Sequence, residues 1–241
     1  MTRRLSALLL LALCTIACQA QPERSATPSA QTLRIAPATR TRASKILVDA
    51  RQHEPALTSA LQELARSHGA RLYGLNHRLK TAPSLERKIQ TALLHGKAKA
   101  ARGVIISDAL RYTYLIEDEP AGHYEEAAQA ILDELEGMGH KVRLVKNYWP
   151  PGDTYAGLNC NLAFPDGFRW ELQFHTIGSL AAVQEGHDLY EVLRLPTTAL
   201  PKKRSLFDRL TQRWNWVLIP KGILEPPLVH ATEVQRLHKR P

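Results

Sequence analysis

Cysteine is scarce in this chain of 241 residues, which contains three: Cys14, Cys18 and Cys160. Beyond residue 17 the chain keeps Cys18 and Cys160, and neither has further cysteine or histidine neighbours there at the spacings of a zinc site. Long apolar runs are lacking as well. The run from Leu5 to Leu13 is shorter than the roughly 20 residues that a helix needs to span a bilayer. The sequence contains no internal repeat, which argues against a repeat architecture.

The N-terminal segment, residues 1–17, is typical of a secretory signal peptide, with Arg3 and Arg4 before the apolar run. It ends in "TIAC", where a small residue before Cys18 resembles a bacterial lipobox. We therefore expect an exported lipoprotein that is anchored to a membrane through lipid on Cys18, at the periplasmic or outer-membrane face. Cleavage near Ala20 without lipidation, giving a secreted protein, is the alternative.

Three further segments follow in the predicted organisation. Residues 18–45 are rich in Ala, Ser, Thr, Pro and Arg and lack apolar periodicity, so they predict a flexible tether. Residues 46–200 are expected to form the catalytic domain, and residues 201–241 a basic extension that packs on it. The net charge of +9, with 44% hydrophobic residues, is that of a globular chain that favours polyanionic partners such as nucleotides, RNA or anionic lipid.

Helical and strand patterns alternate without a strict βαβ rhythm. The clearest signal is "LNCNLAFPDGFRWELQF", where Pro165, Asp166 and Gly167 separate two alternating runs and predict a β-hairpin. Pro55 suits the first turn of the first predicted helix. The expected helices are 53–70, 84–96, 122–139, 179–194 and 202–217, and the other expected strands are 103–107 with its continuation 111–118, and 140–149. This pattern predicts an α+β fold with a mainly antiparallel mixed sheet flanked by helices.

Positive charge is concentrated where the second predicted helix begins. Ser84 and Lys88 are four residues apart and share a helix face, while Arg78 and Lys80 lie on one side of the extended segment before it. A helix N-terminus with fixed cations and a hydroxyl suits an anion such as a triphosphate. A solvated basic face, with Ser84 as a helix cap, is the alternative.

The second strand of the hairpin, "FRWELQFHT", has a polar side. Period two places Arg169, Glu171, Gln173 and His175 opposite the apolar residues. A glutamate on a rigid strand among polar neighbours suits metal binding or general-base catalysis. The wet face of an antiparallel sheet would give the same pattern.

These segments resemble one enzyme family. "RLKTAPSLERK", from Arg78 to Lys88, is similar to the ATP-binding signature R-x-K-x-x-x-S-x-x-R-K of RelA/SpoT-type alarmone synthetases. "ISDALRYTYLI", "YWPPGDTYAGLN" and "WELQFHT" follow in order and resemble that family's aspartate-bearing strand, its Gly-Tyr-Arg-x-Leu-His segment and its Glu-x-Gln-x-Arg-Thr strand. The resemblance covers residues 50–195. It implies a nucleotidyltransferase-like fold and a Mg²⁺-dependent transfer of the β,γ-diphosphate of ATP to a ribose 3′-OH.

The resemblance also implies a role for each matching residue. The residues implied to hold the ATP phosphates are Arg78, Lys80, Ser84 and Lys88. Those implied to bind Mg²⁺ are Asp108 and Glu171, and Glu171 is also a candidate to take the proton from the attacking hydroxyl. The residues implied on the acceptor side are Tyr155, which would stack on the acceptor base, and Asn159, Gln173 and His175.

The departures from the family pattern fall on the acceptor side. Thr154 and Ala156 flank Tyr155 where the family has Gly and Arg, Asn159 replaces a histidine, and His175 replaces an arginine. This is similar to a divergent, toxin-like branch, and it leaves guanine nucleotides, adenine nucleotides and tRNA ends open as acceptors. An exported enzyme of this kind would fit an effector that acts in another cell. A catalytically inactive lipoprotein that keeps the fold and binds a nucleotide or a partner is the alternative function.

Overall fold

The computed structural model of the chain describes residues 34–94, 105–152, 154–195, 197–225 and 234–235. The chain divides into two units, residues 1–34 and 35–241, and the second contains nearly all of the described residues. The predicted signal peptide, Cys18 and residues 18–33 of the predicted tether lie outside the described residues. No helix in the described ranges is both long enough and apolar enough to cross a bilayer.

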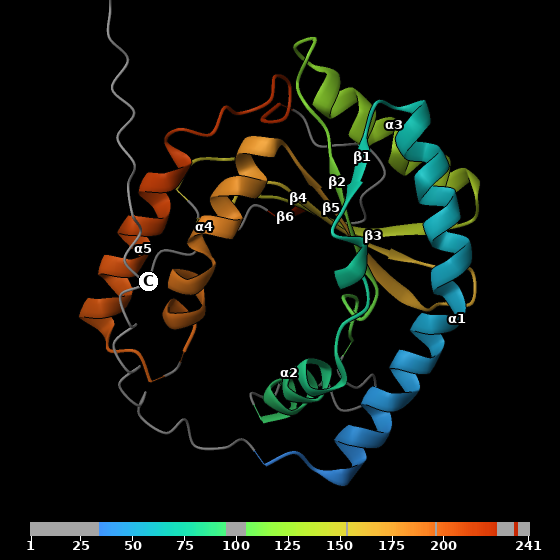
Figure 1. Cartoon of the computed structure of the whole chain (residues 1–241), viewed down its shortest axis with the longest axis vertical. Helices are drawn as coiled ribbons and strands as arrows, with labels where there is room; N and C mark the ends of the chain where they lie inside the picture. The colour runs from blue at the N-terminus through green and yellow to red at the C-terminus, as the bar shows by residue number, and fades with distance from the viewer. Residues whose placement is uncertain (1–33, 95–104, 153, 196, 226–233, 236–241) are drawn as a thin grey trace, which may run out of the picture. The chain divides into compact units, whose positions relative to one another are not determined.

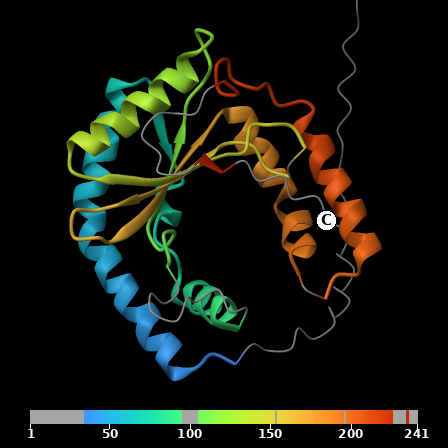
Figure 2. The same ribbon diagram turned by 180° about the vertical axis from the view of Figure 1, so that it is seen from behind.

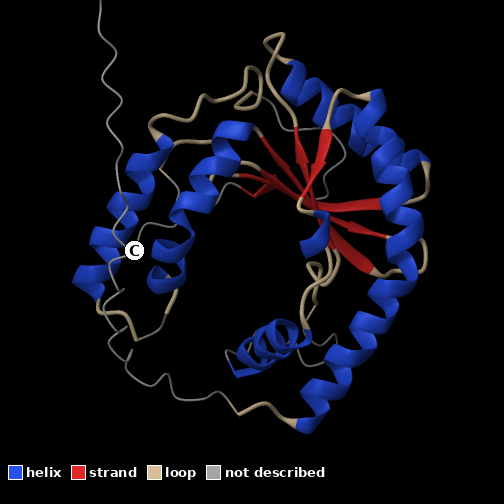
Figure 3. Cartoon of the chain, viewed as in Figure 1, coloured by secondary structure: helices blue, strands red, loops and turns tan. Residues whose placement is uncertain are grey.

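A mixed β-sheet forms the centre of the second unit (Figure 3). Among the described residues its six strands lie in the order β1-β2-β5-β4-β3-β6, in which β2–β5 and β3–β6 pair in parallel and the other neighbours pair antiparallel. The strands are β1 Arg71–Tyr73, β2 Arg111–Leu115, β3 Lys141–Asn147, β4 Leu158–Ala163, β5 Arg169–His175 and β6 Val234–Gln235.

Helices flank this sheet, so the predicted α+β class is confirmed (Figures 1 and 2). Helices α1 and α3 cover one face of the sheet, and α5 packs against α4. The helices are α1 Pro37–Ser67, the short 3₁₀ helix η1 Leu75–His77, α2 Ala82–Leu94, α3 His123–Gly137, α4 Ile177–Leu193 and α5 Leu200–Trp214.

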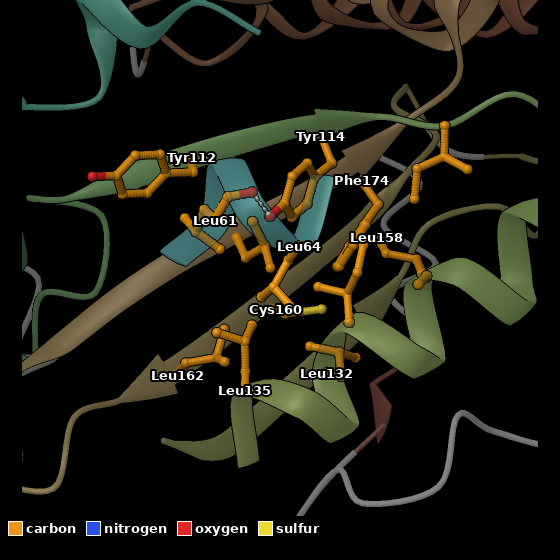
Figure 4. Packing of buried hydrophobic residues seen from close by; sticks show 14 of the residues in the cluster. Leu61, Leu64, Tyr112, Tyr114, Leu132, Leu135, Leu158, Cys160, Leu162 and Phe174 are labelled. Atoms are coloured by element: carbon orange, nitrogen blue, oxygen red, sulfur yellow. Dashed lines mark hydrogen bonds between the residues drawn. The ribbon is translucent and has the colours of Figure 1, made fainter. Parts of the chain in front are cut away.

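The core lies between the sheet and helices α1 and α3 (Figure 4). On β5 the alternation of the sequence buries Leu172 and Phe174 on this side. Leu61 of α1 packs against them, and its carbonyl accepts a hydrogen bond from the Tyr114 hydroxyl at 2.6 Å. Because neighbouring side chains of a strand point to opposite faces, the same alternation places Glu171 on the other face of the sheet.

The β4–β5 hairpin is confirmed, and its turn has the predicted chemistry. Gly167 has a φ of +90°, a conformation that glycine adopts at little cost. The Asp166 carboxylate accepts a hydrogen bond from the backbone N–H of Phe168 at 2.9 Å. The turn fixes the register of β4 against β5, and with it the partners of Glu171 across the sheet.

The predicted tether ends earlier than expected. Helix α1 already begins at Pro37, and Pro55 lies in its interior rather than in a first turn. Residues 37–45 are helical because Ala43 and Leu47 pack on Leu85 and Ile89 of α2. The buried residues of this stretch, Thr39 and Ala43, have small side chains, so the sequence shows no apolar stripe there.

The predicted strand before Asp108 is also wrong where the structure describes it. Residues 103 and 104 lie outside the described ranges, and residues 105–109 form no strand. Ile106 and Ala109 are instead buried in the small cluster beneath α1 and α2. The apolar run therefore reflects burial of an irregular segment rather than pairing in the sheet.

Candidate functional site

The candidate site begins where the segment before α2 meets the segment before β2. Leu79 and Leu110 form an isolated antiparallel bridge. The backbone N–H of Lys80 donates to the carbonyl of Ala109 at 2.9 Å. This pairing holds Lys80 beside Asp108, although 28 residues separate them in the sequence.

One carboxylate oxygen of Asp108 forms ion pairs with two lysine side chains. Its Oδ2 lies 3.0 Å from the Nζ of Lys80 and 2.6 Å from the Nζ of Lys88, which extends from α2. The Asp108 side chain is only 11% exposed, and its second oxygen, Oδ1, is buried without a hydrogen-bond partner. Burial by itself raises the pKa of Asp108, but the charges and hydrogen bonds of Lys88 and Lys80 outweigh it and hold that pKa below its ordinary value.

Glu171 lies close to this group on strand β5. The backbone N–H of Glu171 donates to the carbonyl of Leu110 at 3.0 Å, and Arg111 is its partner in the parallel register. Burial raises the pKa of Glu171, and the negative charge of Asp108 adds to the increase, against the opposing charges of Arg111, Lys88 and Lys80. The two carboxyl groups therefore have pKa values shifted in opposite directions, the arrangement expected of a pair with different roles.

Gln173 connects Glu171 to the polar row next to it on the sheet. Its Nε2 donates to Oε1 of Glu171 at 2.8 Å, and its own Oε1 accepts from the Thr113 hydroxyl at 3.4 Å. Gln173 is also the partner of Asn159 in the β4–β5 register. It therefore lies between the carboxylates and the residues predicted for the acceptor.

Tyr155, Asn159 and His175 form a hydrogen-bonded chain. The Tyr155 hydroxyl donates to Oδ1 of Asn159 at 2.7 Å and lies 2.7 Å from Nε2 of His175. Burial lowers the pKa of His175 to about 4, so the ring is neutral at pH 7. Nε2 then donates to the Tyr155 oxygen, and Nδ1 accepts from the Ser179 hydroxyl at 2.9 Å.

Arg78 does not join Lys80 and Lys88. Its guanidinium pairs with Glu54 of α1 and donates to the carbonyl of Leu75 at 2.5 Å. The expectation that Arg78 and Lys80 lie on one side assumed an extended backbone, whereas Arg78 ends the 3₁₀ helix η1 with φ −65° and ψ −31°. Ser84 lies in the first turn of α2, half-buried. Contact of Arg78 or Ser84 with ATP stays a prediction.

Two charged residues of this region were not predicted. "RYTYL" alternates as clearly as β5 does, and this alternation places Arg111 on the same face as Glu171. Glu54 carried no signal at all, because its pairing with Arg78 joins residues 24 positions apart across a turn. Arg111 adds a positive charge beside Glu171. The Glu54 carboxylate pairs with Arg78, which the sequence predicts to bind ATP.

The residues present fit a magnesium ion that a phosphate-bearing ligand helps to hold. Mg²⁺ is usually held by one or two carboxylates together with waters and substrate phosphates. Asp108 offers a buried oxygen without a partner, and Glu171 is a second carboxylate in the same group. In the described part of the chain no three His, Cys, Asp or Glu side chains group as a metal site. A metal cage made by the protein alone is therefore not a feature of these residues.

The solved structures that are similar to this chain include the following three. The complex between the type VI effector Tas1 and its immunity protein matches with 18% identity and a TM-score of 0.49, over 73% of this chain and 95% of that one. Small alarmone synthetase 1 from Bacillus subtilis matches with 14% identity and a TM-score of 0.48, over 71% of this chain and 89% of that one. The same synthetase bound to its product pppGpp matches with 14% identity and a TM-score of 0.46, over 73% and 95%. No protein-family model and no curated protein matches the chain. Because each TM-score is below 0.5, these similarities carry no weight in assigning the function.

Proposed function

We propose that this protein is a Mg²⁺-dependent diphosphotransferase that moves the β,γ-diphosphate of ATP to the ribose 3′-OH of a nucleotide or of an RNA 3′ end. One observation carries the proposal. Lys80 and Lys88 converge on Asp108, whose second oxygen is buried without a partner, and Glu171 lies half-buried beside them. Paired carboxylates among fixed cations are what phosphoryl transfer requires.

Lys80 and Lys88 are the proposed contacts of the ATP phosphates. Without ATP they neutralise Asp108, and with ATP their ammonium groups can turn to the phosphate oxygens close by. The N-terminal end of α2, which contains Ser84, adds its partial positive charge. A magnesium ion held by Asp108 together with phosphate oxygens would neutralise charge on the phosphates as the transfer proceeds.

Glu171 is the proposed acceptor of the proton from the attacking hydroxyl. Its raised pKa brings it closer to neutral pH than an ordinary glutamate, which favours proton uptake. The hydroxyl oxygen attacks the β-phosphorus of ATP, the bond from that phosphorus to the α,β-bridging oxygen breaks, and AMP leaves. Gln173 orients the Glu171 carboxylate through its 2.8 Å hydrogen bond.

The chain of Tyr155, Asn159 and His175 is proposed to contact the acceptor. His175 is neutral at pH 7 because burial lowers its pKa to about 4, and Asn159 carries no charge. Recognition through these groups is therefore by hydrogen bonding and ring contact rather than by charge. This fits a nucleoside portion, and leaves the choice among guanine nucleotides, adenine nucleotides and RNA ends to experiment.

Export and lipid attachment at Cys18 belong to the same proposal. The N-terminal sequence supports a membrane-anchored form, and a basic chain suits a nucleotide or RNA acceptor. Since ATP is needed, the proposed working place is a compartment that contains ATP, as for an effector delivered to another cell.

The test is transfer from labelled ATP with the purified mature protein, offered GTP, GDP, ADP and tRNA in turn with Mg²⁺. We expect release of AMP together with label on one acceptor. Binding of ATP without transfer to any acceptor would contradict the proposal and favour the inactive nucleotide-binding protein instead.

A further inference from the structure

The segment that follows helix α5, residues 215–225, presents two large apolar side chains that are almost fully exposed. Trp216 is 89% exposed and Leu218 is 88% exposed, and Ile219 and Leu224 of the same segment are exposed to a lesser degree. Single exposed apolar side chains are common on protein surfaces, whereas several that lie together mark an interaction surface.

Contacts with the rest of the unit hold this segment in place. The backbone N–H of Lys221 donates to Oδ2 of Asp118 at 2.9 Å. Val217, which is partly buried, packs against the main core. Because Val217 packs inward while the residues on either side of it are exposed, the fold itself directs Trp216 and Leu218 to the outside.

Helix α5 carries basic side chains in line with Trp216. The helix lies at the edge of the unit in both views, with one side against α4 (Figures 1 and 2). Lys202 and Arg209 are exposed and seven residues apart, so they share a helix face. The backbone is still helical at Asn215, with φ −62° and ψ −18°. Trp216, seven residues after Arg209, therefore continues this row.

The same stretch has an excess of positive charge. Residues 200–225 contain six Lys or Arg residues against Asp208 and Glu225, which gives a net charge of +4. One of the six, Arg213, pairs with Glu185 of α4. The basic side chains that are exposed are those of Lys202, Arg204, Arg209 and Lys221.

These side chains match the surface of an anionic membrane. Trp rings settle at the headgroup level of a bilayer, aliphatic side chains enter the acyl boundary, and Lys and Arg are attracted to anionic headgroups. An RNA would use the positive charge but not Leu218, and the centre of a protein interface is depleted of Lys. The sequence also predicts lipid on Cys18, 16 residues before the first described residue, and such a length spans at most about 55 Å. A membrane is therefore the partner that both the charge and the apolar side chains favour.

We propose that the α5 surface docks on a bilayer that contains anionic phospholipid; this surface consists of Lys202, Arg204, Arg209, Trp216, Leu218 and Lys221. Trp216 and Leu218 enter the interfacial layer, and the basic side chains contact lipid phosphates. The proposal stands whether or not Cys18 carries lipid, and whether or not the chain transfers diphosphate.

Sedimentation with lipid vesicles tests the proposal. The protein is the mature chain from residue 18, produced without its signal peptide so that Cys18 carries no lipid. Vesicles of phosphatidylcholine alone are compared with vesicles of phosphatidylcholine and phosphatidylglycerol in equal parts. We expect binding to the mixed vesicles that weakens as salt is added, because salt screens the charges, and little binding to phosphatidylcholine alone.

Variants separate the apolar contribution from the charge. Trp216→Ser and Leu218→Ser should each weaken binding to the mixed vesicles roughly tenfold, because apolar area no longer leaves water. Arg209→Ala should weaken it roughly fivefold, the contribution of one basic residue near an anionic surface. Met138→Ser, at another exposed apolar position, is the matched control and should bind as the wild type does. The Tm of Trp216→Ser and Leu218→Ser should not change, since both side chains are exposed.

Three results would overturn the proposal. The first is no binding to the mixed vesicles. The second is wild-type binding by both Trp216→Ser and Leu218→Ser. The third is self-association of the wild-type chain that Trp216→Ser abolishes while vesicle binding stays the same, which would assign the surface to a second copy of the chain.

Discussion

At the scale of single residues, Asp108 is the centre of the proposed phosphate site. It holds Lys80 and Lys88 on one oxygen, so the two cations are already positioned before any anion arrives. Their mutual repulsion is offset by the same carboxylate. An incoming triphosphate would replace that carboxylate as the partner of the lysines and leave Asp108 able to hold a cation.

The first prediction concerns Lys88. Replacing Lys88 by Ala removes one charge-assisted contact to the phosphates, so ATP affinity should fall roughly 10- to 100-fold. Calorimetry of ATP with Mg²⁺ measures this directly. Lys141→Ala is the control, since it removes the same charge from an exposed position at the start of β3. Equal affinity of the two variants would show that Lys88 does not contact ATP.

The second prediction concerns His175 and pH. The pKa of His175 is about 4 in the folded protein and about 6.5 in an unfolded chain, so between these values only the unfolded chain gains the proton. The free energy of unfolding should therefore fall by about 3 kcal/mol from this residue as the pH drops from 6.5 to 4. Well above pH 6.5, where the histidine is neutral in the unfolded chain as well, the residue should have no effect.

Urea unfolding at several pH values checks this, with His175→Gln as the comparison. The variant should lose stability less steeply between pH 6.5 and 4, whatever its stability at pH 7. His140, whose pKa burial also lowers, keeps its own contribution in both proteins. Asp108 takes up its proton at a lower pH than an ordinary aspartate, because its pKa lies below the ordinary value. Parallel curves for the two proteins would show that His175 is not held neutral by burial.

At the scale of elements, helix α2 depends on α1 for its position. Leu85 and Ile89 are fully buried against Ala43 and Leu47 of α1. Lys88, next to Ile89, extends from the same helix to Asp108. The packing of α2 on α1 therefore sets the geometry of the proposed phosphate contacts.

The third prediction follows from this packing. Ile89→Ala leaves a cavity between α1 and α2 and should lower the free energy of unfolding by about 2–5 kcal/mol. ATP affinity should fall as well, because the helix that carries Lys88 is no longer held in a fixed position. Urea unfolding and ATP calorimetry measure the two effects. Leu93→Ala is the control on the same helix, since Leu93 is 41% exposed, and it should change both quantities much less. Equal losses in the two variants would contradict the importance of the α1–α2 contact.

Local patterns in the sequence predict the elements well and their long-range contacts poorly. The turn residues Pro165 to Gly167 and the alternation around Glu171 predict the hairpin and the face that carries the carboxylate. The spacing of basic residues between Arg78 and Lys88 is enough to predict that Lys80 and Lys88 lie close to one another. The pairing of Arg78 with Glu54 and the burial of Ala43 against α2 depend on how separate segments pack, which no local pattern contains.

At the scale of the whole molecule, the N-terminal sequence predicts that the protein is attached to a membrane through a lipid. The fourth prediction is that Cys18 is lipidated and that the mature form is bound to a membrane. Labelling with a fatty-acid analogue in a bacterial host should mark the wild-type chain and not Cys18→Ala. Label retained in Cys18→Ala, or absent from both proteins, would refute lipid attachment at Cys18.

The most direct test of the proposed function is the effect of Glu171→Gln on transfer and on ATP binding in the same preparation. The substitution removes the charge of Glu171 with little change in volume, while Glu126→Gln at an exposed position of α3 is the matched control. If Glu171 takes the proton from the attacking hydroxyl, diphosphate transfer should fall by about 10²–10⁴-fold, while ATP still binds through Lys80 and Lys88. Transfer by Glu171→Gln at the rate of the Glu126→Gln control would contradict the proposed role of Glu171 as the proton acceptor.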